Sequence, residues 1–347
     1  MKKIVAIIGA RPQFIKHAPL EIELCKKFEV VTIHTGQHFD ESMSQVFFDE
    51  LGMKAPNYLL SLGGGTHGEM TGKMLIEMEP ILLKESPDWV LVYGDTNSTL
   101  AGALLASKLG IRIIHVEAGL RSFNRSMPEE INRVVTDHLA SILLAPSDAA
   151  IQHLVDEGVK RGVYQTGDVM LDALKLIEHV VTEPNQEKEY ILMTLHRPYN
   201  VDDFDRLHLI LKSVAALEQR IIFPLHPRTR AVLKEKQVLN AYDNISFIEP
   251  IGYIQNMSYL THASGLITDS GGMQKEAYFL KKKCMTIRSE TEWVETLSSG
   301  WNTLVFSNDE LAQVEEVWSK TPGEYDASLY GDGRASAEIS NIIEQYK

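Results

Sequence analysis

The chain has 347 residues, of which 44% are hydrophobic and 23% charged, a composition typical of a soluble globular protein of roughly two domains. Its formal net charge of −13 argues against nucleic acids and anionic membranes as partners, because their phosphates would repel it. An anionic ligand must therefore bind in a local basic pocket.

The cysteines and the N-terminus bear on the compartment. Cys25 and Cys284 lie far apart in apolar sequence, which favours a reducing environment over a disulfide framework or a Cys-rich metal site. The first apolar run, residues 4–8, is interrupted by Arg11-Pro12 and is too short for a signal peptide. No segment approaches transmembrane length. We therefore expect a cytoplasmic protein that makes no membrane contact.

In the first half of the chain, short apolar runs alternate with helical patterns. The runs at 4–8, 30–34, 89–93, 111–116 and 141–145 predict strands. Residues 99–109 predict a helix, with leucines near helical spacing. Strands that are apolar throughout and separated by helices indicate a parallel sheet covered on both faces.

The alternation starts again in the second half. Strands are predicted at 190–194, 220–224, 245–248, 265–268 and 284–287, with the clearest helix at 207–217. We expect two Rossmann-like doubly wound α/β domains, 1–172 and 173–332, with a ligand cleft at the carboxyl ends of their strands. The sequence leaves open whether the final helix, about 333–347, packs back on the first domain.

The loop after the first strand carries two cations. Arg11 follows Gly9-Ala10 at the strand exit, and Lys16 lies about one helical turn further on. Both can reach the predicted cleft. A capping loop with two solvated cations is the alternative.

Two carboxylates follow the next apolar strands. Asp95 ends the strand at 89–93 and fits equally well a cleft carboxylate or a helix N-cap. Glu117 follows a strand rich in isoleucine and valine. A half-desolvated carboxylate at such a strand mouth has a raised pKa and is a better base.

A helix is predicted to begin at Pro128, a residue that suits the first helical position. Glu129 and Arg133 are four residues apart and point away from the predicted buried stripe. They are candidate site residues, although a surface ion pair worth about 0.3–0.5 kcal/mol explains them as well. The stripe itself consists of Ile131, Val134, Val135 and Leu139.

In the second half, basic clusters follow two neighbouring strands. His196-Arg197 and His226 occupy these strand ends, where they can contact phosphates. No pair of histidines or aspartates has zinc-like close spacing, so a metal site is disfavoured. The glycine fingerprint of a dinucleotide fold is absent after the first strand, so a nicotinamide cofactor is disfavoured too.

The turn after residues 265–268 has the pattern of an anion site. The sequence Ser270-Gly271-Gly272 separates the strand from a helix, whose first N–H groups lack internal partners and can bind phosphate. Glu276 lies about one turn into this helix, where it can accept hydrogen bonds from a ribose.

Together, in this order and as far as Tyr330-Gly331-Asp332-Gly333, these motifs resemble the non-hydrolysing UDP-N-acetylglucosamine 2-epimerases. The resemblance implies the two-domain glycosyltransferase-B fold, a homodimer, no redox cofactor and a UDP-sugar for cell-surface polysaccharide synthesis. It also implies inversion at C2 through loss and re-addition of UDP. The implied reaction site comprises Arg11, Lys16, Asp95, Glu117, Glu129, Arg133 and His196. The implied UDP site comprises Ser270, Gly271, Gly272 and Glu276.

The chain departs from the common pattern of this family at several positions. Pro198-Tyr199-Asn200 replaces a Glu-Asn pair, and Gln13 and Lys275 each replace a glutamate. With Trp293 in place of an arginine and the segment Ser122-Phe123-Asn124, these features resemble the epimerases of UDP-2,3-diacetamido-2,3-dideoxyglucuronate.

Alternatives to a UDP-N-acetylglucosamine epimerase therefore stay open. One is the same reaction on a 3-acetamido or uronate sugar, whose carboxylate Lys275 would help to balance. The others are a glycosyltransferase, a hydrolysing epimerase and a non-catalytic nucleotide-sugar sensor. The Gln37-His38 pair resembles part of an allosteric substrate site in bacterial relatives, but residues 39–41 and 63–67 differ, so we expect weak or absent substrate activation.

Overall fold

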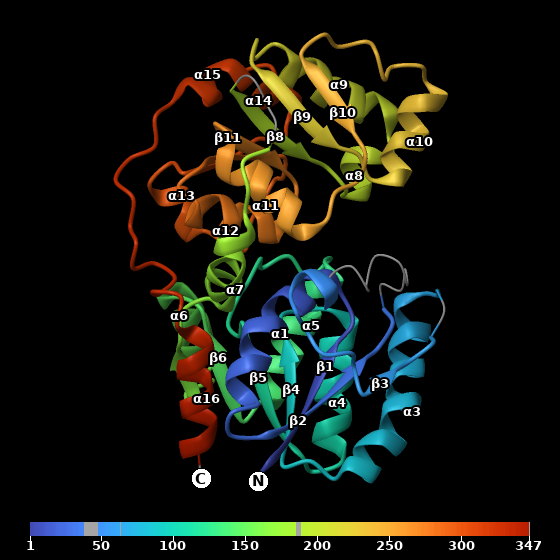
Figure 1. Cartoon of the computed structure of the whole chain (residues 1–347), viewed down its shortest axis with the longest axis vertical. Coiled ribbons are helices and arrows are strands. Elements are labelled where there is room, and N and C mark those ends of the chain that lie inside the picture. The colour runs from blue at the N-terminus through green and yellow to red at the C-terminus, as the bar shows by residue number, and fades with distance from the viewer. Residues whose placement is uncertain (38–47, 63, 185–188, 347) are drawn as a thin grey trace. The chain divides into compact units, whose positions relative to one another are not determined.

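The computed structural model describes residues 1–37, 48–62, 64–184 and 189–346 (Figure 1). The chain forms two compact units, Met1–His179 with Ala327–Lys347, and Val180–Asp326. Of the Gln37-His38 pair, which resembles part of an allosteric site, Gln37 accepts hydrogen bonds from the backbone and side chain of Ser98, at 2.9 and 2.8 Å. His38 and residues 39–41 lie outside the described residues, so weak or absent substrate activation stays a prediction.

In the described part of the first unit, seven parallel strands form one sheet in the order β3-β2-β1-β4-β5-β6-β7. The strands are β1 (Lys3–Ile8), β2 (Glu29–His34), β3 (Tyr58–Leu59), β4 (Trp89–Tyr93), β5 (Arg112–Val116), β6 (Ile142–Ala145) and β7 (Val163–Gln165). Every residue of β4 is buried, as expected for a parallel strand covered on both faces. The pattern missed only the short edge strands β3 and β7 among the described strands of this unit, because every residue of these two strands is partly or fully exposed.

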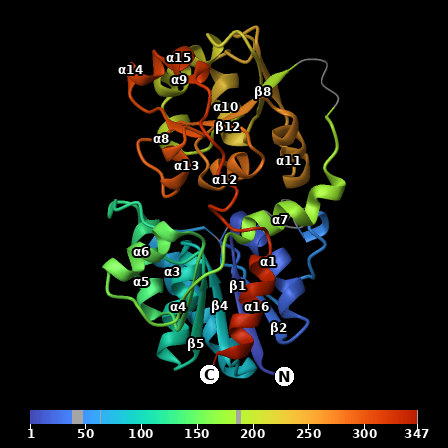
Figure 2. The ribbon, with the colours of Figure 1, turned by 90° about the vertical axis from the view of Figure 1, so that its left-hand side faces the viewer.

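The helices of the first unit cover this sheet (Figures 1 and 2). They include α1 (Arg11–Leu24), α3 (His67–Glu85), α4 (Asn97–Lys108), α5 (Pro128–Leu139), α6 (Asp148–Asp156), α7 (Val169–Ile177) and α16 (Ala335–Gln345), and the short 3-10 helix Glu178–Val180 follows α7 where the chain passes from one unit to the next. The terminal helix α16 packs on α1 and α7, which answers the question that the sequence left open (Figure 2). The first unit extends to His179, beyond residue 172, because α7 buries Val169, Met170 and Ile177 in it.

Among the described residues of the second unit, six parallel strands form a sheet in the order β10-β9-β8-β11-β12-β13. The strands are β8 (Tyr190–Thr194), β9 (Arg220–Pro224), β10 (Ile245–Ile248), β11 (Gly265–Thr268), β12 (Lys283–Thr286) and β13 (Asn302–Leu304). The helices are α8 (Pro198–Val201), α9 (Phe204–Ala215), α10 (Pro227–Glu235), α11 (Tyr253–His262), α12 (Gly271–Phe279), α13 (Glu295–Ser298), α14 (Asn308–Leu311) and α15 (Val314–Ser319). In its core, Ile191, Phe223 and Ile267 of three strands pack with α9.

The prediction for α5 was wrong about which face is buried. Of the predicted stripe, Ile131 and Val135 are 50% and 36% exposed, whereas the polar residues on the other side are buried. The polar face of α5 can be buried because its side chains form hydrogen bonds with the loops that follow β4 and β5. Burial therefore leaves these polar side chains with hydrogen-bond partners. The buried polar residues are Glu130, Asn132, Arg133, Thr136 and Asp137.

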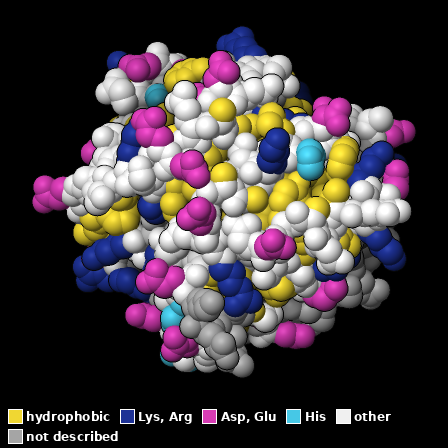
Figure 3. Space-filling model, turned by 90° about the horizontal axis from the view of Figure 1, so that it is seen from above, with side chains coloured by type: hydrophobic (Ala, Val, Ile, Leu, Met, Phe, Trp, Pro, Cys, Tyr) yellow, Lys and Arg dark blue, Asp and Glu magenta, His cyan; other side chains and the backbone are white. Residues whose placement is uncertain are grey.

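The distribution of surface charge and the apolar character of the helices bear on nucleic acids and membranes as possible partners. Acidic and basic side chains lie interspersed over the face seen in Figure 3. No described helix combines the length and apolar character needed to cross a membrane.

Candidate active site

In the first unit, α1 begins directly after β1 and carries Lys16 to a carboxylate. Lys16 Nζ forms an ion pair with Glu117 Oε2, and both residues are buried, at 7% and 9% exposure. The sequence argument considered only the burial of this carboxylate and did not include the neighbouring cation. Arg11 is the first residue of α1 and is half-buried.

Gln13, which replaces a glutamate of the family pattern, has side-chain contacts that require an amide. Its Oε1 accepts the N–H groups of Gly9 and Ala10, at 2.8 and 3.1 Å, and its Nε2 donates to the carbonyl of Tyr93 at 3.0 Å. A glutamate carboxylate could not donate the last bond. The amide therefore ties the loop after β1 to the end of β4, next to Asp95.

Glu117 occupies strained backbone beside a glycine. Its φ is 69°, in the left-handed region, which costs a non-glycine residue about 1–2 kcal/mol. A Cβ on Gly94 would lie 3.1 Å from Glu117 Oε2 and 3.6 Å from Lys16 Nζ, so this glycine leaves room for the ion pair. Strain of this kind is concentrated at functional sites.

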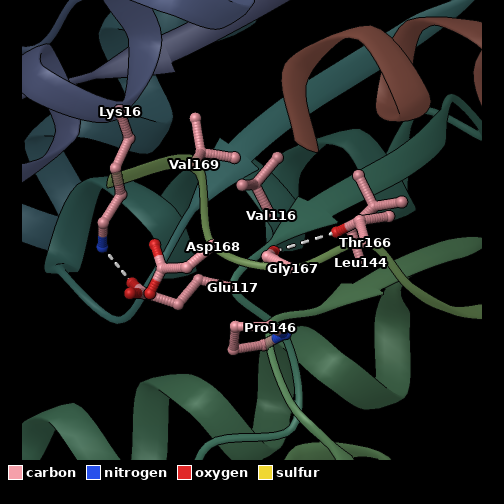
Figure 4. Close-up of a pocket in the computed structure, with 9 residues that line it drawn as sticks. All are labelled: Lys16, Val116, Glu117, Leu144, Pro146, Thr166, Gly167, Asp168 and Val169. Carbon is pink, nitrogen blue, oxygen red and sulfur yellow. Dashed lines mark hydrogen bonds and ion pairs between the residues drawn. The ribbon is translucent and has the colours of Figure 1, made fainter. Parts of the chain in front are cut away.

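A small pocket adjoins the pair, and Figure 4 shows the side chains that line it. The Asp168 carboxylate lies beside Glu117 and Lys16 in this view. Asp168 was missed by the sequence argument; it is 3% exposed and caps α7 by accepting the Met170 N–H at 2.8 Å. The full lining is Lys16, Val116, Glu117, Leu144, Pro146, Thr166, Gly167, Asp168 and Val169.

Asp95 is held from α5. Its Oδ2 pairs with Arg133 Nη2 at 2.5 Å, and its carbonyl accepts a bond from Asn132 Nδ2 at 2.8 Å. The N-cap of α4 is Thr96, so the alternative that Asp95 caps this helix was wrong. Arg133 is 3% exposed, which also excludes the solvent-exposed ion pair weighed for it. Glu129 is half-buried in the first turn of α5.

Glu130, another residue that the sequence argument missed, organises the loop after Glu117. Its carboxylate accepts the N–H groups of Ser122 and Phe123, each at 2.9 Å, and pairs with Arg133 at 2.9 Å. Burial raises the pKa of Glu130, but these hydrogen bonds and the Arg133 charge outweigh it and hold the pKa below its usual range. The signal was available, because Glu130 lies on the same helical face as Arg133.

In the second unit, the buried carboxylate of Asp269 joins two predicted motifs. It accepts the N–H groups of His196 and Arg197, at 3.1 and 2.9 Å, and lies directly before the Ser270 turn. His196 Nδ1 lies 3.1 Å from Asp269 Oδ1, and the His196 side chain is 49% exposed. Asn200 Nδ2 donates to the same carboxylate at 3.1 Å, which gives the unusual Pro198-Tyr199-Asn200 segment a local role.

The Ser270 turn has the geometry expected for an anion site. Ser270 Oγ accepts the Met273 N–H at 3.4 Å and caps α12, whose first two residues are Gly271 and Gly272. A Cβ on Gly271 would lie 2.6 Å from Glu292 Oε1, so a larger residue there would collide with a buried carboxylate.

Three further residues of the second unit were singled out from the sequence, namely Glu276, His226 and Lys275. Glu276 is 2% exposed. The pKa of Tyr253 is raised well above its usual range, mainly because Tyr253 is buried and secondly because the negative charge of Glu276 lies nearby. His226 is exposed after β9. Lys275 is 1% exposed, with Nζ 3.8 Å from the centre of the Trp293 ring, so two departures from the family pattern contact each other. This cation–π contact argues against the expectation that Lys275 faces a sugar carboxylate.

These arrangements have complementary chemical capacities. Asp95 and Glu117 follow the adjacent strands β4 and β5, and each has a cation as its partner. Paired carboxylates of this kind can take up and release protons. The N-terminus of α12 suits an anionic group.

Comparisons with known proteins agree with these motifs. The sequence profile of the UDP-N-acetylglucosamine 2-epimerase family matches residues 21–344. A UDP-N-acetylglucosamine 2-epimerase homolog from Methanococcus maripaludis is 50% identical, over 98% of this chain and 99% of the relative. A UDP-2,3-diacetamido-2,3-dideoxy-D-glucuronate 2-epimerase from Pseudomonas aeruginosa is 45% identical over the same shares.

Solved structures extend this likeness to the fold. The UDP-GlcNAc 2-epimerase of Methanocaldococcus jannaschii, in complex with UDP-GlcNAc and UDP, matches with a TM-score of 0.89 and 42% identity, over 100% of both chains. The galactosyltransferase WaaB matches at a TM-score of 0.55 with 12% identity over 99% of both chains, a likeness of fold alone. The predicted glycosyltransferase-B fold is thus confirmed. The chain belongs to the UDP-N-acetylglucosamine 2-epimerase family and is an isomerase.

Proposed function

We propose that this enzyme inverts C2 of a UDP-2-acetamido sugar, of the UDP-GlcNAc to UDP-ManNAc type. The observation that carries the proposal is the pair of ion-paired carboxylates, Asp95 and Glu117, at the ends of adjacent strands in a member of this family. C2 has no adjacent carbonyl, so direct removal of its proton is very difficult. Loss of the leaving group together with the proton avoids a free carbanion.

The proposed reaction has two balanced steps. A carboxylate takes the C2 proton while the bond from C1 to the UDP oxygen breaks, which leaves a C1–C2 double bond in a 2-acetamidoglucal and UDP as an anion. A proton is then delivered to the opposite face of C2, and the UDP oxygen attacks C1. Both steps are redox-neutral and consume no co-reactant.

In this proposal the first unit handles the protons. Glu117 is our first choice for proton transfer, with Asp95 and Glu129 as the other carboxylates. Lys16 is the ion-pair partner of Glu117, and Arg133 is the ion-pair partner of Asp95.

Cations and backbone N–H groups hold the departing diphosphate in this proposal. The site resemblance and the positions at strand ends support the assignment. The residues assigned to UDP are Arg11, Lys16, His196, Arg197, His226, Ser270, Gly271, Gly272 and, for the ribose, Glu276.

A second candidate substrate is UDP-2,3-diacetamido-2,3-dideoxyglucuronate. The relative with that activity in its name is 45% identical, and UDP-N-acetylglucosamine 2-epimerases from Methanococcus maripaludis and Methanocaldococcus jannaschii are 43% and 42% identical. The family resemblance also supports a homodimer, which sedimentation equilibrium tests directly.

Incubation of each UDP-sugar in deuterated water tests the proposal. We expect NMR to detect deuterium at C2 together with the C2 epimer, and the sugar that exchanges fastest to be the substrate. Release of free sugar and UDP would instead indicate a hydrolysing epimerase, and release of UDP only with an acceptor would indicate a glycosyltransferase. Tight binding of the UDP-sugar without any turnover would indicate a sensor.

A further inference from the structure

A buried network of charges lies behind the two carboxylates of the first unit. Asp137 of α5 bonds His115 Nδ1 through Oδ1 and Arg121 Nη1 through Oδ2, each at 2.7 Å. Arg121 forms a two-pronged pair with Glu157, with both bonds at 2.7 Å. His115, Asp137 and Arg121 are no more than 1% exposed. Asp137 is the shared member of these contacts.

Asp137 holds the chain on both sides of Glu117. His115 precedes Glu117 by two residues and Gly119 follows it by two, and Asp137 Oδ2 accepts the Gly119 N–H at 3.1 Å. One carboxylate therefore brackets the residue whose backbone has a φ of 69°. The over-determined surroundings that a strained residue needs are supplied here by Asp137.

The same network reaches the Asp95 loop. The second ring nitrogen of His115 lies 2.8 Å from the carbonyl of Gly94, the residue directly before Asp95. Burial raises the pKa of Asp137, but the charges and hydrogen bonds of His115 and Arg121 outweigh it and lower the pKa below its usual range. The two ring nitrogens of His115 thus join the Asp137 carboxylate to the Gly94 carbonyl.

Helix α5 is the common support of both carboxylates. Arg133 and Asn132 bind Asp95, and Asp137 lies one turn further along the same buried face. The separation of Asp95 and Glu117 is therefore determined by one rigid helix rather than by two independent loops.

We propose that Asp137 is a positioning residue for the epimerisation. Through His115 it fixes Gly94, and through the bonds on either side of Glu117 it fixes that residue. Asp95 and Glu117 thereby keep one separation while protons move to and from C2. The inference rests on the proposed function, because it assigns the network a part in that reaction.

The test compares two buried aspartates that both accept backbone N–H groups in the first unit. In Asp137→Asn, the amide nitrogen replaces one carboxylate oxygen and must face a hydrogen-bond donor. The contacts with His115 on one side, or with Arg121 and Gly119 on the other, are therefore lost. We expect kcat to fall about 100-fold, the loss typical of a small misplacement of catalytic groups, with KM and the UDP Kd within about twofold of wild type. Asp172→Asn is the matched control, because Asp172 caps α16 through Ala335 and Ser336, at 3.2 and 2.7 Å. It should lower Tm and leave kcat unchanged.

Each outcome decides the matter. A wild-type kcat in folded Asp137→Asn overturns the inference, and so does an equal loss of kcat in Asp172→Asn. If Asp137→Asn does not fold, His115→Gln is measured in the same way, with the same expectation. If neither folds, hydrogen exchange of the Gly119 amide, which donates to Asp137, is followed by NMR in the wild-type enzyme: strong protection supports the network, and exchange at the rate of an unprotected amide overturns it. Absence of C2 exchange in wild type would refute the proposed function instead, and the amide result would still stand.

Discussion

Replacing Gly271 by alanine tests the proposed phosphate site at one atom. An ideal Cβ at this position lies 2.6 Å from Glu292 Oε1, and ordinary contacts begin at 3.4 Å. The carboxylate must therefore retreat by about 0.8 Å, the difference of these two distances. Its retreat is opposed by Arg288, whose Nη2 lies 3.0 Å from Glu292 Oε2 in a buried pair.

The stability cost can be worked from this geometry. Lengthening the ion pair from 3.0 Å by that amount costs about 1 kcal/mol at an effective dielectric constant of about 20. Alanine in place of glycine also restricts the unfolded chain, which stabilises the folded protein by about 0.4–1 kcal/mol where the backbone suits alanine. The two terms nearly cancel, so we expect the free energy of unfolding to stay within about 1 kcal/mol of wild type.

Affinity for UDP should change much more. The added methyl and the displaced carboxylate crowd the first N–H groups of α12, and overpacking of this kind costs about 1–3 kcal/mol. We therefore expect the UDP Kd to rise about 10- to 100-fold in isothermal titration calorimetry. Gly72→Ala is the control, because a Cβ there meets nothing within 4 Å on α3; it should leave the UDP Kd unchanged. Equal UDP affinity in Gly271→Ala and wild type would refute the phosphate assignment.

Three more substitutions test the first unit. Lys16→Met removes the cation beside buried Glu117, so kcat should fall about 100-fold in steady-state assays, and an unchanged kcat would remove Lys16 from the mechanism. Burial lowers the pKa of His17 to about 3 from 6.5, so the unfolded chain binds that proton more tightly, and stability should be lost as pH falls from 6.5 toward 3. The free energy of unfolding should fall by roughly 3–5 kcal/mol over this pH range. Urea unfolding at several pH values should show that the free energy of unfolding depends less on pH in His17→Gln than in wild type. An equal pH dependence would contradict this account. Glu130 has a lowered pKa, so its contribution is present above the usual carboxyl pKa and lost as pH falls below it. Glu130→Gln should lower stability at pH 7 by about 1–3 kcal/mol and reduce kcat through Arg133; unaltered unfolding and kcat would show that the bonds are weak.

The strand pattern was predictable because of the way parallel sheets are covered. Residues 89–93, 190–194, 220–224, 245–248 and 265–268 match their strands at both ends. Helices cover both faces of each sheet, so long apolar runs without alternation mark the strands directly. The strands β3, β7 and β13 have only two or three residues and few buried ones, too short a run to produce that pattern.

The candidate site was predictable in part for the same reason. Functional groups in such folds lie in loops at the carboxyl ends of parallel strands, so Asp95 and Glu117 could be proposed as site residues from their position. Their partners could not, because an ion pair between residues 16 and 117 depends on the order of strands in the sheet. The proposed role of each residue came from the resemblance to a family, because position alone does not assign a role.

Helix α5 marks the limit of the sequence most clearly. Its amphipathic pattern fixed the helix and the direction of its two faces, and we assigned the apolar face to the core. Tertiary structure decided the opposite, with Ile131 half exposed and Asp137 buried, because hydrogen bonds from loops distant in sequence satisfy the polar face. Periodicity in the sequence determines which residues share a face, and only the folded contacts determine what that face meets.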